Sequence, residues 1–123
     1  MSRRTLNWKI KETIMRDIKQ TAGRTQLGEF APTFAQVNDD VLFGEVWADE
    51  TLDMKTRSTI VISVFMGRGL ITDALRHHLQ YAKDNGITRE EISAIITHAA
   101  FYAGWPVAWA VFALAKDVWG EEE

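Results

Sequence analysis

Three ionisable side chains of this 123-residue chain, His78, Arg57 and Glu45, have the chemistry to hold an acid and move a proton. A histidine can give or accept a proton near neutral pH. An arginine can bind a carboxylate through two parallel hydrogen bonds. A glutamate in an apolar pocket can share in the proton transfer. Together they suggest acid–base chemistry on a small organic acid.

Each of these residues also has a purely structural explanation. A histidine on a helix is more often a satisfied polar group than a catalyst. Arg57 can pair with a nearby acid such as Asp53, and Glu45 can hydrogen bond to a loop backbone. His77 points about 100° away from His78 around a helix, so we expect it at the surface or at an interface. Sequence alone leaves these alternatives open.

A second group of residues suits a flat, partly apolar ligand. Trp47, Tyr102, Trp105 and Trp109 could line a cavity for a planar ring or lactone, and His98 is the odd polar residue in a nearly apolar segment. We predict these five as substrate-binding residues. The alternative is that packing and interface burial account for the aromatic side chains, and that His98 is a core residue with one hydrogen bond.

Composition excludes several classes of protein. There are no cysteines, which rules out disulfides, thiolate metal sites and cysteine nucleophiles within the chain. We expect no metal or cofactor, because there is no HxxxH or ExxH pair and Gly67-Arg68-Gly69-Leu70 lacks the context of a phosphate loop. The formal charge of −3 gives no reason to expect nucleic acid or an anionic membrane as partner.

The elements that must position these residues are all predicted to be helices, because apolar residues recur at helical spacing and no stretch alternates like a strand. Gly23 is expected to end the first helix, and Asn38-Asp39-Asp40 argues against one continuous helix after Pro32. Lys55 is expected to be solvated. The predicted segments are 6–21, 32–47, 53–68 with Asp53 as N-cap, 72–85 with Thr72 as N-cap and Gly86 beyond its end, 88–104 with a Thr88–Glu91 capping box, and 106–119.

The apolar run from Ile95 to Ala115 is long enough to span a bilayer, but Gly104-Trp105-Pro106 interrupts it. We predict a soluble protein in which other subunits cover this segment. The N-terminus, Ser-Arg-Arg-Thr-Leu-Asn-Trp-Lys after Met1, carries no apolar leader and favours the cytoplasm. With no repeats or linkers, residues 1–123 are predicted to form one domain.

The stretch from Phe43 to Trp119 resembles the carboxymuconolactone decarboxylase family. The order and spacing of five segments carry the resemblance: Phe43-Gly44-Glu45-Val46-Trp47, Leu52-Asp53-Met54-Lys55-Thr56-Arg57-Ser58, His78-Leu79, Asn85-Gly86-Ile87-Thr88-Arg89-Glu90-Glu91-Ile92 and Phe101-Tyr102-Ala103-Gly104-Trp105-Pro106. The resemblance implies an all-α bundle of about six helices, of the alkylhydroperoxidase D-like type, that assembles into homotrimers or hexamers.

The family has two functional branches, and the resemblance bears on both. The thiol peroxidase branch uses a CxxC pair, a glutamate and a histidine, but here Ile71 and Ala74 stand near the cysteine positions and Ser58 at the glutamate. Only His78 is kept, so disulfide chemistry is disfavoured.

The other branch converts 4-carboxymuconolactone, an intermediate of aromatic catabolism, to an enol-lactone and carbon dioxide. The resemblance to it implies a carboxy-lyase without cofactor, with His78 as general acid, Glu45 as its partner and Arg57 on the substrate carboxylate. Ala74 and Trp109 depart from the branch, which usually has a glutamate and an asparagine there. The alternative function is a non-catalytic oligomeric protein that binds a small molecule.

Overall fold

A computed structural model describes residues 10, 12 and 19–120 of the chain. Its contacts divide the chain into two compact units, Met1–Asp53 and Met54–Glu123, which are treated separately below. Every regular element among the described residues is a helix, which confirms the all-α prediction. The predicted first helix, 6–21, lies mostly outside those residues, and the single domain stays a prediction. None of the helices in the described part has the length and apolar character needed to cross a bilayer.

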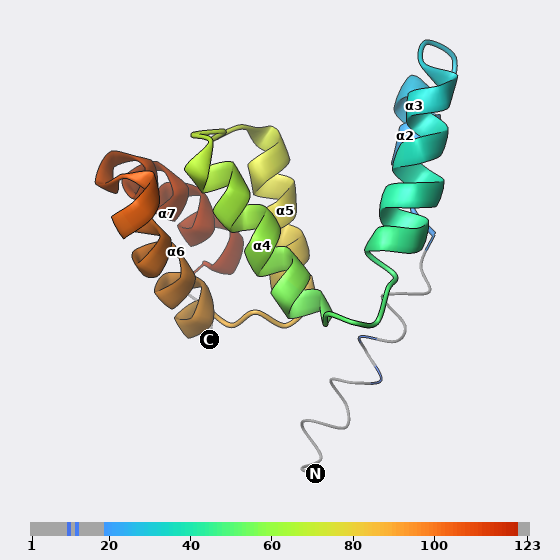
Figure 1. The fold of residues 1–123 in the computed structure, drawn as a ribbon. Coiled ribbons are helices and arrows are strands. Elements are labelled where there is room, and N and C mark those ends of the chain that lie inside the picture. The colour runs from blue at the N-terminus through green and yellow to red at the C-terminus, as the bar shows by residue number, and fades with distance from the viewer. Residues whose placement is uncertain (1–9, 11, 13–18, 121–123) are drawn as a thin grey trace. The chain divides into compact units, whose positions relative to one another are not determined.

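The first unit contains α2 (Ala22–Leu27), α3 (Pro32–Gln36) and the π-helix η1 (Val37–Val46) (Figure 1). The expectation that Gly23 ends a helix is wrong, because Gly23 lies buried in the first turn of α2. Its position depends on Asp39, whose buried carboxylate accepts hydrogen bonds from the backbone amides of Gly23 (2.9 Å) and Arg24 (3.0 Å). The carboxylate thereby satisfies two amides that the helix itself leaves unpaired.

Arg24 binds the two neighbouring acidic residues Asp39 and Asp40. The guanidinium donates two hydrogen bonds to Asp40, at 2.9 and 2.8 Å. Burial alone would raise the pKa of Asp39, but hydrogen bonds from Asn38 and from the Arg24 and Gly23 amides, with the Arg24 charge, hold that pKa below its usual value. The carboxylate therefore stays ionised where the N-terminus of α2 favours negative charge.

The expectation that Asn38-Asp39-Asp40 argues against one continuous helix after Pro32 is met in part, because the chain stays helical but changes from α3 to the π-helix η1 at Val37. The chain passes from α3 into η1 without a gap, and the Trp47 amide closes it by donating to the Leu42 carbonyl five residues earlier, at 2.9 Å. Aspartate usually disfavours helix because its side chain competes for the local backbone. Here the Asp39 side chain binds α2 instead, so that competition is absent.

The second unit contains four longer helices, α4 (Met54–Gly67), α5 (Asp73–Asp84), α6 (Arg89–Ala103) and α7 (Trp105–Trp119). They agree with the predicted segments to within one or two residues. Gly86 adopts φ 99° just past α5, and both hydrogen bonds of the Thr88–Glu91 capping box are present. Thr72 occupies the N-cap position of α5, but its side chain makes no capping hydrogen bond.

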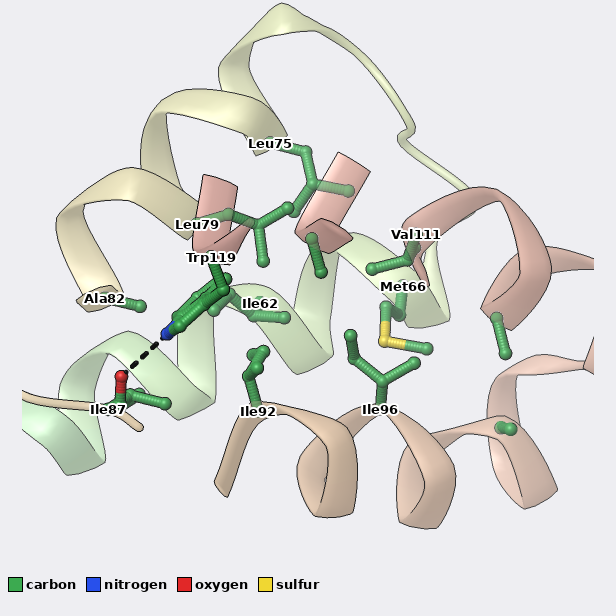
Figure 2. Close-up of a cluster of buried hydrophobic side chains, with 13 residues drawn as sticks. Ile62, Met66, Leu75, Leu79, Ala82, Ile87, Ile92, Ile96, Val111 and Trp119 are labelled. Carbon is green, nitrogen blue, oxygen red and sulfur yellow. Dashed lines mark hydrogen bonds between the residues drawn. The ribbon is translucent and has the colours of Figure 1, made fainter. Parts of the chain in front are cut away.

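All four helices contribute to one apolar core (Figure 2). Its buried members are Ile62, Met66, Leu75, Leu79, Ala82, Ile87, Ile92, Ile96, Ala100, Ala108, Val111, Ala115 and Trp119. Trp119 also fastens the end of α7 to the α5–α6 connection, since its indole nitrogen donates to the Ile87 carbonyl at 3.0 Å. Burying the indole with its polar N–H satisfied adds apolar area without a desolvation cost.

Helix α4 presents one buried stripe to this core. Met54, Ser58, Ile62 and Met66 are buried and recur every four residues. The polar member, Ser58, is matched by Asn85 at the end of α5, whose side-chain amide donates to the Ser58 hydroxyl at 3.1 Å. This buried hydrogen bond links α4 to the end of α5.

Two glycine substitutions should affect stability in opposite directions. A Cβ at Gly23 would lie 2.6 Å from an Asp39 carboxylate oxygen and 2.8 Å from the Ala35 carbonyl, whereas at Gly67 it would meet nothing within 4 Å. We expect Gly23→Ala to lower the urea midpoint of unfolding. Gly67→Ala should raise stability by up to about 1 kcal/mol, because alanine loses less backbone entropy in a helix. Equal effects of the two substitutions would contradict the close approach at Gly23.

Candidate functional site

His78 lies on the side of α5 that faces α4. Its ring is half-buried and packs against Phe65 of α4, with ring centroids 5.3 Å apart and planes tilted by 58°. Burial, and to a smaller extent the charge of His77, lowers the pKa of His78 below its ordinary value. The imidazole is therefore mostly neutral at pH 7, and its protonated form is a stronger acid than a free histidine.

Arg57 lies on the same side of α4 as Phe65, two turns earlier. Residues 57, 61 and 65 are spaced by four and so follow one flank of the helix. The Arg57 side chain is half-buried in the first turn of α4. Eight residues of helix separate Arg57 from Phe65 by a rise of about 12 Å. We call this side of α4 and α5 the His78 flank.

The other predicted residues of the N-terminal part belong to the first unit. Glu45 is exposed in the last turn of η1. Trp47 follows directly and is 5% exposed, with its ring stacked on Phe43 at 6.1 Å between centroids and 17° between planes. Trp47 therefore already packs against an aromatic partner in its own unit. Whether Glu45 and Trp47 serve the His78 flank stays a prediction.

A groove of about 540 Å³ runs between α4 and α6. This α4–α6 groove is lined by Thr59, Ser63, Gly67, Ala94, Ile95, His98, Ala99, Tyr102 and Ala103. It brings together two of the predicted substrate-binding residues, since the rings of His98 and Tyr102 stack at 5.8 Å and 18°. The volume lies within the range usual for sites that bind small molecules.

The groove and the His78 flank lie on opposite sides of α4. Ser63 faces the groove and Phe65 faces His78, and two residues correspond to about 200° around a helix. Neither His78 nor Arg57 lines the groove. The structure of the second unit therefore separates the predicted substrate-binding pair, His98 and Tyr102, from the predicted catalytic residues His78 and Arg57.

Trp105 and Trp109 lie on a third surface. They are 55% and 73% exposed, one turn apart on α7, and Trp105 meets the ring of Phe101 edge-on at 5.7 Å. Phe101 itself is 76% exposed. We call Phe101, Trp105 and Trp109 the aromatic surface. Exposed aromatic patches of this kind typically mark interaction sites.

Sequence reasoning missed the contribution of α4 to the groove. Thr59, Ser63 and Gly67 are small residues spaced by four, next to the buried stripe of the same helix. That spacing is visible in the sequence, but small residues without ionisable groups gave no reason to predict a binding site there.

The expectation that Lys55 is solvated is wrong, because its ammonium donates to Glu91 at 2.9 Å and so links the first turns of α4 and α6. Within residues 10, 12 and 19–120, no three potential ligands among His, Cys, Asp and Glu gather as a metal site would need.

The lowered pKa of His78 predicts a specific pH dependence of stability. Because the folded state binds this proton less tightly than the unfolded state, stability should fall as pH drops below the ordinary histidine value of 6.5 and level off below the folded pKa. We expect His78→Gln to lose less stability than the native protein between pH 7.5 and 5, measured by urea unfolding. His77→Gln should act in the same direction but less strongly. An unchanged slope in His78→Gln would contradict the burial effect.

Comparison with known proteins matches residues 32–117 to the carboxymuconolactone decarboxylase family. The chain is 35% identical over 92 residues to a 4-carboxymuconolactone decarboxylase of Acinetobacter baylyi, an alignment that covers 75% of this chain and 68% of that protein. It is 36% identical over 64 residues to a nitrosuccinic acid decarboxylase of Metarhizium robertsii, covering 52% and 44%. It is also 27% identical over 96 residues to an uncharacterised protein of Paracoccus denitrificans, covering 77% and 72%. By its sequence and its all-helical fold, this chain belongs to the carboxymuconolactone decarboxylase family.

Proposed function

We propose that this protein is a carboxy-lyase without cofactor that acts on a small carboxylated lactone or ring acid, resembling 4-carboxymuconolactone. The observation that carries the proposal is the half-buried His78, packed on Phe65, with Arg57 on the same flank of α4. Support also comes from two relatives that are named decarboxylases of different acids. Decarboxylation of such an acid calls for one cation that binds the carboxylate and one proton donor, and the His78 flank contains Arg57 and His78 for these two roles.

In the proposed reaction, Arg57 binds and orients the substrate carboxylate. The bond between the ring carbon and the carboxylate carbon breaks, carbon dioxide leaves, and the electron pair passes to the ring as an enolate. Protonated His78 then donates its proton to the ring carbon beside the lactone carbonyl, which gives an enol-lactone and leaves His78 neutral. Burial lowers the pKa of His78, which makes the imidazolium a better donor and favours the neutral ring after the transfer. The neutral His78 then regains a proton from solvent, which completes the cycle.

The first test is turnover of 4-carboxymuconolactone, followed by ultraviolet absorbance. His78→Ala should lose on the order of 10²- to 10⁴-fold in kcat, the usual contribution of a positioned acid. Arg57→Lys should raise KM about tenfold, because lysine keeps the charge but not the paired hydrogen bonds. His77→Ala is the matched control and should retain near-native turnover.

Two outcomes would oppose this assignment. Full activity of His78→Ala would remove His78 as the proton donor. Absence of turnover by the folded native protein would exclude this substrate and favour the second candidate, a non-catalytic protein of the same fold that binds a small molecule. The specific observation behind that candidate is that His98 and Tyr102 line a groove remote from His78 and Arg57.

We further propose that the protein is a homo-oligomer that buries the aromatic surface between subunits. Three large rings that are more than half exposed would each gain apolar burial on association. The family resemblance favours a trimer or hexamer.

Light scattering after size exclusion tests this proposal. Trp109→Glu should reduce the oligomeric mass, because the introduced charge would have to be buried at the contact. Lys116→Glu, an exposed change of charge about two turns further along α7, is the control and should leave the mass unchanged. A native protein that runs as a monomer would contradict the proposal.

A further inference from the structure

The α4–α6 groove is lined by polar and apolar side chains but by no acidic side chain, lysine or arginine, although relatives of the chain are named as decarboxylases of acids. Its polar lining consists of the Thr59 and Ser63 hydroxyls, the His98 imidazole and the Tyr102 phenol. No Lys, Arg, Asp or Glu side chain is among its lining residues. The rest of the lining is glycine, alanine and one isoleucine, which make the floor apolar.

Two of the polar groups are available to a ligand. Thr59 donates its hydroxyl hydrogen to the Lys55 carbonyl at 2.8 Å, so it presents only acceptor lone pairs to the groove. The half-buried Ser63 hydroxyl makes no hydrogen bond to another residue in the described part of the chain. Ser63 can therefore both donate and accept, as the hydroxyl or carbonyl oxygen of a ring compound requires.

One cation beside the groove, Lys55, is already paired. Lys55 lies one turn before Thr59, but its ammonium is bound to Glu91 at 2.9 Å. An anionic ligand would lose part of its hydration in this open groove without gaining an ion pair from the lining residues, which has a cost. A neutral ring loses little on entering and gains contact with the apolar floor. At the rim, the parallel rings of His98 and Tyr102 offer a face for stacking.

We propose that the α4–α6 groove is a second ligand site, separate from the His78 flank, and that it binds a small uncharged planar ring bearing a hydroxyl or carbonyl oxygen. Ser63 and Thr59 bind that oxygen, and His98 with Tyr102 covers one edge of the ring. The groove thus prefers uncharged ligands, whereas the proposed role of Arg57 is to bind carboxylates. Its existence does not depend on catalysis at His78.

The three histidines of the chain allow each site to be observed directly, because His77, His78 and His98 give separate imidazole signals in nitrogen-15 nuclear magnetic resonance. Titration at pH 8 with p-cresol, a neutral ring with one hydroxyl, should shift the His98 signals and leave those of His78 in place. Benzoate, an anion of similar size, should bind to the groove at least tenfold more weakly. Ser63→Ala should weaken the binding of p-cresol by about three- to tenfold, the effect of one hydrogen bond.

A groove-filling variant gives the decisive control. Gly67 lines the groove, and a Cβ there meets nothing within 4 Å, so Gly67→Leu should fill the space without disrupting the helix. Binding of p-cresol should be lost in Gly67→Leu and kept in Arg68→Leu, which adds the same side chain at a position that does not line the groove.

Several results would overturn the proposal. Native-like binding of p-cresol by Gly67→Leu would place the ligand elsewhere, and stronger binding of benzoate than of p-cresol would contradict the charge argument. A change of oligomeric mass in Gly67→Leu, with no ligand-induced shift of His98 in the native protein, would show that a second copy of the chain covers the groove. None of these binding measurements depends on turnover at His78. Failure of the proposed lyase activity can therefore be distinguished from failure of the proposed groove site.

Discussion

The buried stripe of α4 is the constraint on which the second unit depends. Met54, Ser58, Ile62 and Met66 commit one side of the helix to the core, and the hydrogen bond between Asn85 and Ser58 fixes it against α5. The side chains of a helix point in all directions around its axis, so each neighbouring helix can contact only one part of its surface. Once the core takes one side, the two neighbouring flanks must face α5 and α6. The His78 flank and the α4–α6 groove are therefore both consequences of how α4 is buried.

Burial also decides what His78 can do chemically. The family resemblance suggests His78 as a general acid, and its burial against Phe65 lowers the pKa of His78 and favours the neutral ring. A transiently protonated His78 suits a step in which the proton is given away and not kept. Arg57, always charged, is better suited to hold the substrate through the whole reaction. In the proposed reaction, Arg57 would thus provide a permanent charge and His78 a temporary one.

Local signals in the sequence predicted the second unit well, and the first unit poorly. The capping box of Thr88 and Glu91 and the left-handed Gly86 act within a few residues of themselves, so their positions could be read directly. Asp39 acts on Gly23 across 16 residues, and nothing in the local pattern reveals such a contact. The site shows the same division. His78 could be singled out by its chemistry, whereas Ser63 and Gly67 gain meaning only when α6 lies beside them.

The position of Ser63 and Phe65 on opposite flanks has an evolutionary consequence. Residues only two apart in the sequence can accumulate substitutions independently, since each flank meets a different helix and the buried stripe stands between them. Under the two proposals made above, a lineage could change the ring that binds in the groove while selection on the reaction at His78 continues unchanged. Helix α4 would then allow recognition to diversify without loss of activity.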